Sequence, residues 1–547
     1  MQVEFVLLVL SLLFFVSILT DKIGYRLGVP ALLLFLAVGM LFGPDGIGKW
    51  IGTDGIGYMV NIGTAQALGT VALSIILFSG GMDTKITEIR PVIWQGVTLA
   101  TLGVLLTMLI TGLIIYLVFG WLHSVGTLSL MMALLIAATM SSTDSASVFS
   151  ILRTNGIQFK HGLKPILELE SGANDPMAYI LTVTLIGIVT GDGTDTITPL
   201  EIIQNVLIQL VMGAVMGFAF GKLVVQLLKR VRLSNQSLYP IMVLSACVFI
   251  FGVTYYMKGN PYLAVYIGGL IIGNTKFTRK RQTKSFFDGL TWLAQLVMFL
   301  MLGLMVRPPE LMSWEVWVPC LIISVVMIFV SRPISVFLCM LPFKQYKLQD
   351  RLMLSWVGLK GAVPIIFAIM CVAENVPHAS LLFNVVFACT LVSLLVQGTT
   401  LNRMARRLHL VAPAELERHL YYFDIDLPEE IESLAREREV DESLMQRGNC
   451  LKDLAIPKGT LVIMVRRGEN FFIPTGSTEL QLGDQLLIIS DHDAAVAKEA
   501  LEKAEEEEND IIELQIMNNT VDFVKTMWRK MKGEDTKRLT TNDQRLI

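Results

Sequence analysis

The stretch ELESGANDP, residues 168–176, decides the fold, because it places ionisable and amide side chains inside an apolar run over residues 166–190. A run of this length can cross a bilayer, for which about 20 mostly apolar residues are needed. Ionisable side chains inside such a segment are costly, and they usually mark a transport path. The stretch therefore predicts a membrane-spanning helix that carries a polar site.

The composition places most of the chain in a membrane. Hydrophobic residues make up 53% of the 547 positions and charged residues only 17%, whereas a soluble globular protein carries about 25% charged residues. The mean hydropathy is +0.60. Much of the charge lies after about residue 410, so we expect a long lipid-embedded part followed by a polar C-terminal part.

Thirteen apolar segments have the length that a spanning helix needs. They centre on residues 4–20, 29–44, 62–80, 92–119, 128–149, 166–190, 202–227, 239–257, 260–275, 286–306, 314–342, 352–374 and 379–401. Nearly all Lys and Arg residues between segments follow the odd-numbered ones. Because positively charged loops stay in the cytoplasm, we expect a multi-pass protein of the cell (inner) membrane. Its N-terminus lies outside and its C-terminus is cytoplasmic.

The side chains of the sixth segment form stripes on a helix. Ser171 and Asp175 are four residues apart, as are Glu170 and Asn174, so each pair shares a helix face. Pro176 deprives the carbonyl one turn upstream of its usual donor. Carboxylate, hydroxyl and carbonyl oxygens are hard ligands that suit an alkali cation, and the lack of thiols and imidazoles argues against a transition metal.

Two other segments contain patterns that break helices. The fifth contains ATMSSTDSASV, residues 138–148, with Thr143 and Asp144, and the twelfth contains WVGLKGAVP, residues 356–364, with Lys360. The two segments are an odd number apart, so they cross the bilayer in opposite directions. Broken helices at inverted positions are typical of inverted-repeat secondary transporters, and Asp144 and Lys360 can offset the partial charges of the half-helix ends.

These features predict an all-α polytopic membrane protein with about 13 transmembrane helices, inverted repeats, two broken helices and a small α/β cytosolic C-terminal domain. Arg332, in the eleventh segment, is weighed equally as a structural and a functional residue. Hydroxyl side chains in membrane helices often only pack or bond across helices, which is the competing interpretation of the polar cluster.

The sequence resembles the NhaP-type cation:proton antiporters, and in particular the bacterial potassium/proton antiporters of that type. The resemblance covers residues 1 to about 405, and its most specific part is the Asn-Asp pair within ESGAND. The motifs that carry it are LGVPALLLFLAVGMLFGP (27–44), LFSGGMDTK (77–85), SSTDSASV (141–148), LELESGANDPMAY (167–179) and VGLKGAVPIIFA (357–368).

The resemblance implies a role for each site residue. Asp175 is similar to the carboxylate that binds the cation or the proton in turn, and Ser171 and the Thr143 carbonyl are similar to further cation ligands. Asp144 corresponds to a residue beside the site that acts through water, and Asn174 to one that steadies the broken fifth helix. A buried carboxylate can be neutralised by either a proton or a cation, so the two ions exclude each other.

The resemblance also implies a buried ion pair between Glu170 and Lys360, although most relatives carry Arg where this chain has Lys360. The Asn-Asp arrangement implies electroneutral one-for-one exchange. We expect alternating access, in which a bundle of segments carries the site past a scaffold that forms a homodimer. The transported ions are H⁺ and K⁺, which the resemblance favours, or Na⁺. The expected role is regulation of cytosolic cation content and pH.

The C-terminal part predicts a separate small domain. We expect residues 1–405 to form the transport domain, 415–500 the small domain, and 501–547 an acidic helix and a disordered tail. Residues 428–438 favour a helix, and 460–491 favour strands joined by Gly-containing turns. This second block resembles the TrkA-C half of RCK domains, which regulate ion transporters, pair as dimers and sometimes bind small nucleotides.

Other function classes have weaker support. A cation channel or efflux pathway gated by the C-terminal domain is the main alternative, but the sequence shows no repeated pore loop. An anion transporter needs a positively charged site, whereas this one is rich in carboxylates. No catalytic motif indicates an enzyme. We expect no cofactor and no nucleic-acid partner, with the lipid bilayer, a second copy of the chain and a small nucleotide as the candidate partners.

Overall fold

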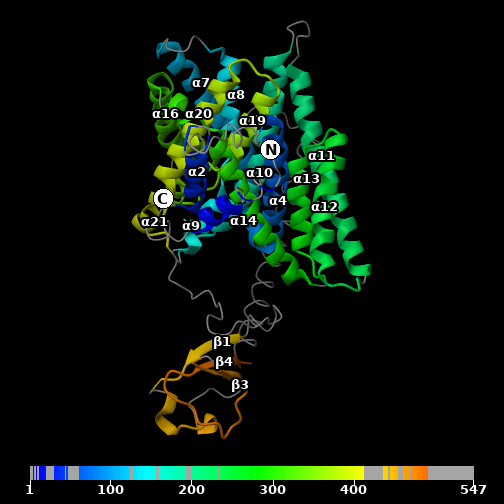
Figure 1. Cartoon of the computed structure of the whole chain (residues 1–547), viewed down its shortest axis with the longest axis vertical. Helices are drawn as coiled ribbons and strands as arrows, with labels where there is room; N and C mark the ends of the chain where they lie inside the picture. Colours follow the sequence, from blue (N-terminus) through cyan, green and yellow to red (C-terminus); the bar gives the residue numbers. More distant parts are fainter. Residues whose placement is uncertain are drawn as a thin grey trace, which may run out of the picture. The chain divides into compact units, whose positions relative to one another are not determined.

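The chain forms two compact units in the computed structural model, Met1–Ala414 and Glu415–Ile547. The first is helical and the second contains a small sheet (Figure 1). The structure describes residues 4, 8, 11–19, 30–43, 45, 46, 61–122, 128–154, 157, 159–191, 199–231, 233–277, 279–311, 313–411, 435–441, 444–453, 460–468 and 470–490.

Twelve of the thirteen predicted segments coincide with described helices, and the first, of which residues 11–19 are helical, lies partly outside the described residues. The helix-rich fold class is thereby confirmed, while the total of thirteen stays a prediction. Eight described helical stretches are long and apolar enough to cross a membrane. They are Ile62–Asp83, Ile86–Trp121, Leu163–Thr190, Leu200–Arg230, Leu238–Tyr256, Lys280–Met305, Val316–Cys339 and Ala379–Arg407, with Ala31–Phe42, Leu130–Thr139, Pro261–Gly273 and Val363–Ala373 as shorter apolar helices.

One group of helices forms a scaffold (Figure 1). It consists of α2 (Ala31–Phe42), α4 (Ile62–Asp83), α11 (Pro199–Arg230), α12 (Leu238–Tyr256), α13 (Pro261–Gly273) and α14 (Lys280–Met305). Glycines allow α13 to lie directly against α4. A side chain at Gly269 or Gly273 would come within 2.2 Å of the carbonyl oxygen of Phe78 or Met82. Small residues at this spacing let membrane helices pack backbone to backbone.

The remaining long helices form a second group, the bundle, whose α10 and α19 face the scaffold helices α13 and α4. The bundle contains α6 (Ile93–Thr98), η3 (Leu99–Gly103), α7 (Val104–Leu122), α8 (Leu130–Thr139), α9 (Ser145–Thr154), α10 (Leu163–Thr190), α16 (Trp314–Val326), η4 (Met327–Ser331), α17 (Arg332–Cys339), α18 (Leu348–Trp356), α19 (Val363–Ala373), α20 (Ala379–Ser393), η5 (Leu394–Gly398) and α21 (Thr399–Arg407). The turns η3, η4 and η5 are π-helical, a distortion that is frequent at functional sites.

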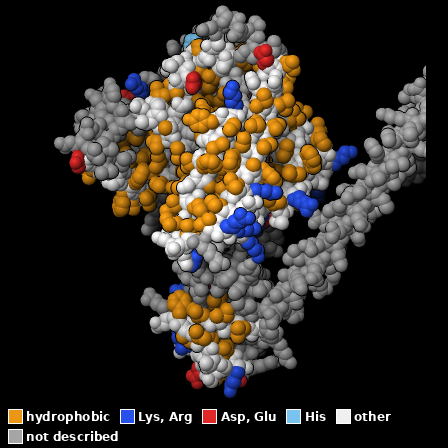
Figure 2. Space-filling model, turned by 90° about the vertical axis from the view of Figure 1, so that its right-hand side faces the viewer, with side chains coloured by type: hydrophobic (Ala, Val, Ile, Leu, Met, Phe, Trp, Pro, Cys, Tyr) orange, Lys and Arg blue, Asp and Glu red, His pale blue; other side chains and the backbone are white. Residues whose placement is uncertain are grey.

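The outer surface of the helical unit is apolar. Large side chains such as Leu207, Val211 and Phe249 are more than half exposed, and hydrophobic side chains cover much of the face seen in Figure 2. On that face most of the Lys and Arg side chains lie toward one end of the helical unit (Figure 2). A surface of this kind is compatible with lipid around its middle and water at its ends.

The second unit contains a four-stranded antiparallel sheet in the order β1-β4-β2-β3. Its strands are β1 (Ala435–Glu439), β2 (Thr460–Arg467), β3 (Asn470–Phe472) and β4 (Gln485–Ser490). The strands predicted within 460–491 are present. The helix predicted over 428–438 is wrong at 435–438, which belong to β1, and its remaining residues lie outside those described. The tail predicted over 501–547 also lies outside the described residues.

Candidate functional site

The fifth and twelfth segments are interrupted, as the sequence predicts. Helix α8 ends at Thr139 and α9 begins at Ser145, while α18 ends at Trp356 and α19 begins at Val363. The structure buries residues 140–143 and 357–362 of the non-helical backbone between them in protein, where such backbone can be tolerated at membrane depth. The two interruptions are therefore structural features of the bundle and not only breaks in the hydropathy pattern.

The two interruptions touch each other. The Asp144 N–H donates to the Leu359 carbonyl over 2.8 Å, so one non-helical segment satisfies a backbone group of the other. A side chain at Gly361 would lie 2.0 Å from Asp144 Oδ2, which only glycine avoids. Glycine is thus required at position 361, where the two segments meet.

Asp144 caps the helix that follows it. Its Oδ1 accepts the Ser147 N–H at 3.0 Å, and its Oδ2 accepts the Ser147 hydroxyl at 2.5 Å. A carboxylate at this position satisfies free N–H groups and complements the positive end of the helix dipole. The partly exposed Asp144 therefore serves as the N-terminal cap of α9, in addition to any role beside the ion.

Helix α10 brings its polar stripe against the first interruption. The Ser171 hydroxyl donates to the Thr143 carbonyl at 2.8 Å, and Asn174 Nδ2 donates to Thr143 Oγ1 at 2.6 Å. Asp175 is buried, and its Oδ1 has no hydrogen-bond partner among the described residues. The structure thus brings together Thr143, Ser171, Asn174 and Asp175, four of the residues that the sequence singles out.

Lys360 lies at the C-terminal end of α8. Its Nζ donates to the carbonyls of Ser142 at 2.8 Å and Ser141 at 3.4 Å. Both carbonyls belong to the non-helical segment that follows α8, and a positive charge near the C-terminal end of a helix opposes the negative end of its dipole. The predicted role of Lys360 in offsetting a half-helix end stays a prediction.

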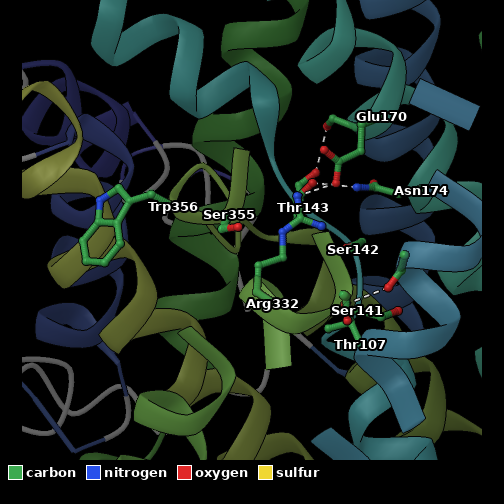
Figure 3. A network of polar contacts seen from close by, with 12 residues as sticks. Thr107, Ser141, Ser142, Thr143, Glu170, Asn174, Arg332, Ser355 and Trp356 are labelled. Carbon is green, nitrogen blue, oxygen red and sulfur yellow. Dashed lines mark hydrogen bonds and ion pairs between the residues drawn. The ribbon is translucent and has the colours of Figure 1, made fainter. Parts of the chain in front are cut away.

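The predicted ion pair between Glu170 and Lys360 is wrong. Glu170 Oε1 accepts from Arg332 Nη2, and both side chains are buried (Figure 3). Arg332 is brought to this position by the π-helical turn η4, and it lies over Gly358, where a side chain would meet Arg332 Nε at 2.9 Å. Arg332 therefore ties the eleventh segment to the sixth and passes beside the interrupted twelfth.

Two residues of the last segment were missed by the sequence reasoning. The Lys360 N–H donates to Ser393 Oγ at 3.0 Å, and Ser393 Oγ donates to Gln397 Oε1 at 2.5 Å. Gln397 Nε2 in turn donates to the Trp356 carbonyl at 2.9 Å. This relay spans the interruption and replaces helical hydrogen bonds. The spacing of four between Ser393 and Gln397, in an apolar segment, was the signal that could have revealed it.

A third missed residue links the bundle to the scaffold. Asn260, buried at the start of α13, donates from Nδ2 to the Pro176 carbonyl at 2.7 Å. Its Oδ1 caps α13 by accepting the Leu263 N–H at 3.0 Å. This hydrogen bond joins the scaffold to α10 one residue beyond Asp175.

The donor set at the crossing consists of oxygen atoms. Among the described residues, no group of three or more His, Cys, Asp and Glu side chains could hold a metal ion of the kind that such clusters bind. The nearby charges that act on the Asp175 carboxylate are those of Asp144 and Lys360. Hard oxygens with one negative charge at the centre suit a monovalent cation.

Comparison with known proteins agrees with this geometry. Residues 9–407 match the family described as "Sodium/hydrogen exchanger, transmembrane", and residues 436–500 match the TrkA-C domain. The chain is 37% identical over 479 residues to the K(+)/H(+) antiporter NhaP2 of Shewanella oneidensis, covering 88% of this chain and 80% of the relative. It is 36% identical over 491 residues to the K(+)/H(+) antiporter NhaP of Alkalimonas amylolytica, covering 89% and 81%.

A solved structure shares the fold. The sodium proton antiporter MjNhaP1 of Methanocaldococcus jannaschii superimposes with a TM-score of 0.63 at 21% identity, covering 75% of this chain and 99% of that one.

Proposed function

Since this chain belongs to the sodium/hydrogen exchanger family, whose members exchange a monovalent cation for protons across a membrane, we propose that its cation is K⁺ and that Asp175 is the shared carrier. The chain is a multi-pass membrane transporter and not an enzyme. K⁺ is favoured over Na⁺ because two relatives at 36–37% identity are K(+)/H(+) antiporters.

The single observation that carries the assignment of Asp175 is that its carboxylate is buried without an ion-pair partner among the described residues. Asp175 makes no ion pair among the described residues, and its Oδ1 lacks a hydrogen-bond partner there. An uncompensated buried charge is costly, so the carboxylate must be neutralised by a bound ion. A proton and an alkali cation each supply one positive charge, and binding of one excludes the other. One-for-one, electroneutral exchange follows from this competition.

The transport cycle we propose is alternating access. The bundle carries Asp175 on α10, and its contact with the scaffold runs along α13 and α4. Movement of the bundle past the scaffold, permitted when Asp175 is neutralised, exposes the site to one side and then the other. The hydrogen bond from Asn260 to the Pro176 carbonyl crosses this boundary, so it must break when α10 slides.

The orientation, the location and the assembly belong to the same proposal. The distribution of Lys and Arg between segments supports a location in the cell (inner) membrane, with the N-terminus outside and the C-terminus in the cytoplasm. The cycle then regulates cytosolic cation content and pH. The TrkA-C match at 436–500 supports regulation by the small domain, and a homodimer and a small nucleotide ligand for that domain stay predictions.

Purified protein in vesicles with a pH-sensitive dye inside tests the assignment. Addition of K⁺ should dissipate an imposed pH gradient, and Asp175→Asn should abolish this response while the protein still purifies as a folded species. Asp83→Asn is the matched control, because Asp83 is an exposed carboxylate that pairs with Lys284 at 3.4 Å. Persistent K⁺-dependent proton flux through Asp175→Asn would refute the assignment. Cation flux whose rate does not depend on the proton gradient would indicate a channel instead.

A further inference from the structure

Among the described residues 139–143, the hydroxyl groups are paired with other parts of the protein, except for that of Ser142. Thr139 Oγ1 donates to the Ile136 carbonyl at 2.8 Å, and Ser141 Oγ donates to the Ala138 carbonyl at 2.7 Å. The Thr143 hydroxyl accepts from Asn174. The Ser142 hydroxyl is 1% exposed, and apart from the Asp175 carboxylate beside it, it has no hydrogen-bond partner among the described residues.

The backbone of Ser142 is held by a contact with Lys360. Lys360 Nζ donates to the Ser142 carbonyl at 2.8 Å, which helps to hold the backbone of this residue in place. The hydroxyl lies beside the Asp175 carboxylate, whose Oδ1 is without a partner among the described residues. A hydroxyl and a buried carboxylate that have only each other, with one carboxylate oxygen left without a partner, form a polar position that a bound cation can complete.

We propose that the Ser142 hydroxyl oxygen is a direct ligand of the transported cation and a determinant of its selection, in addition to Asp175. The proposal rests on the function proposed above and names one further atom of that site. A hydroxyl oxygen is a hard, neutral ligand, so it adds coordination without changing the charge balance of the exchange. Selection between alkali ions depends on the number and field of such oxygens.

The same hydroxyl can serve each occupant of the site. A hydroxyl is one donor and two acceptor positions. When Asp175 is protonated, its acid O–H can donate to Ser142 Oγ. When the cation is bound, the hydroxyl turns its lone pair to the ion. The Ser142 hydroxyl therefore has a partner in both neutral states of the site, the acid O–H of Asp175 in one and the cation in the other, which keeps the cost of exchanging the two ions small.

The neighbouring serine supplies a matched control. Ser141 is equally buried and lies in the same segment, but its hydroxyl is satisfied by the Ala138 carbonyl. We expect Ser142→Ala to raise the KM for K⁺ about 10-fold, the effect of one lost ligand interaction, with the maximal rate within about twofold. The ratio of the KM values for K⁺ and Na⁺ should also change. Ser141→Ala should leave both unchanged, and Ser142→Thr should restore the parent values.

A cysteine exchange separates ligation from packing. Ser142→Cys keeps the shape of the side chain at a slightly larger size but replaces a hard oxygen with a soft sulfur, which favours soft cations. In the full-length protein in vesicles, Ser142→Cys should weaken K⁺ about 10-fold and weaken Tl⁺ much less, whereas Ser141→Cys should not change the preference. If Ser142→Ala fails to fold, this variant decides alone.

Two results would overturn the inference. An unchanged KM and K⁺ to Na⁺ ratio in Ser142→Ala would overturn it, as would equal effects of the Ser141 and Ser142 substitutions, since packing alone would then explain both. The Asp175→Asn experiment keeps the two proposals apart. Exchange that persists in Asp175→Asn contradicts the proposed carrier. If Asp175→Asn abolishes exchange but Ser142→Ala keeps the parent KM and ion ratio, only the role of Ser142 is contradicted.

Discussion

The contact between the two interrupted segments can be tested by adding a single methyl group. Gly361→Ala would place its Cβ 2.0 Å from Asp144 Oδ2 and 2.7 Å from Asp144 Cγ. Ordinary contact between such atoms begins at 3.4 Å, so the carboxylate or the two segments must separate by about 1.4 Å. The methyl group therefore perturbs the contact between the two interrupted segments directly.

The structure indicates what this separation would break. Rotation of the Asp144 side chain gives up its hydrogen bonds to Ser147, and loss of a helix cap costs about 1 kcal/mol. Movement of the backbone instead breaks the bond from the Asp144 N–H to the Leu359 carbonyl. A misplacement of about 1 Å at a reacting site can cost about 100-fold in rate, so we expect exchange to fall about 100-fold while the protein still folds.

The assay is K⁺-dependent proton flux in vesicles at matched protein content, with the thermal unfolding midpoint as the check on folding. Gly187→Ala is the control, because it adds the same methyl group to α10 at a position with nothing within 4 Å. It should keep the parent rate. If Gly361→Ala exchanges within threefold of the parent, the tight crossing is not needed for transport and the geometric argument is refuted.

Three further outcomes are expected. Glu170→Gln leaves the buried Arg332 unpaired, so unfolding in detergent should be easier by about 3–5 kcal/mol, and addition of Arg332→Met should recover part of this loss. Gln397→Leu removes the last donor of the relay across the twelfth segment and should lower exchange at least about 10-fold, whereas Thr399→Val on the exposed side of the same helix should not. In the small domain, burial alone raises the pKa of Asp484, but hydrogen bonds from Arg467 and a backbone N–H, with the Arg467 charge, hold that pKa below its ordinary value. Stability from Asp484 is therefore present above about pH 4 and lost as the pH falls further, so Asp484→Asn should speed amide exchange in β2 of the full-length protein at pH 7 but not near pH 3.

Much of the helical unit was predictable, because lipid imposes one simple rule on each segment. Apolar length predicted the helices, and the glycines, hydroxyls and prolines of 138–148 and 356–364 predicted the two interruptions. The stripe of α10 was also predictable, since residues four apart share a face. Contacts between segments were harder to predict, because several partners were compatible with the same pattern.

The partner of Glu170 illustrates this limit. Two buried cations, Lys360 and Arg332, were available to it, and the sequence alone gives no distance to either. The structure pairs Glu170 with Arg332, and the π-helical turn η4 that precedes Arg332 has no clear sequence signature. Ser393 and Gln397 were missed for a related reason, because isolated polar residues in a membrane helix usually indicate packing.

The error in the small domain has a different cause. Residues 428–438, PEEIESLARER, contain good helix formers. The structure instead pairs Ala435–Glu439 with β4, where Arg436 lies opposite Ile488 and Arg438 opposite Leu486. Tertiary pairing with an apolar central strand outweighs local propensity here.

The division of roles between the two buried cations bears on the transport mechanism. A guanidinium presents several fixed donors that suit a carboxylate, whereas an ammonium is a point charge that can serve two carbonyls. Arg332 accordingly forms the ion pair with Glu170, and Lys360 donates to the Ser142 carbonyl just beyond α8. Each resident cation thus has another acceptor, so Asp175 keeps a negative charge that no ion pair among the described residues cancels. A structure in which Lys360 turned from the Ser142 carbonyl to bind Asp175 at every stage of the cycle would remove the reason for a transported ion to bind there.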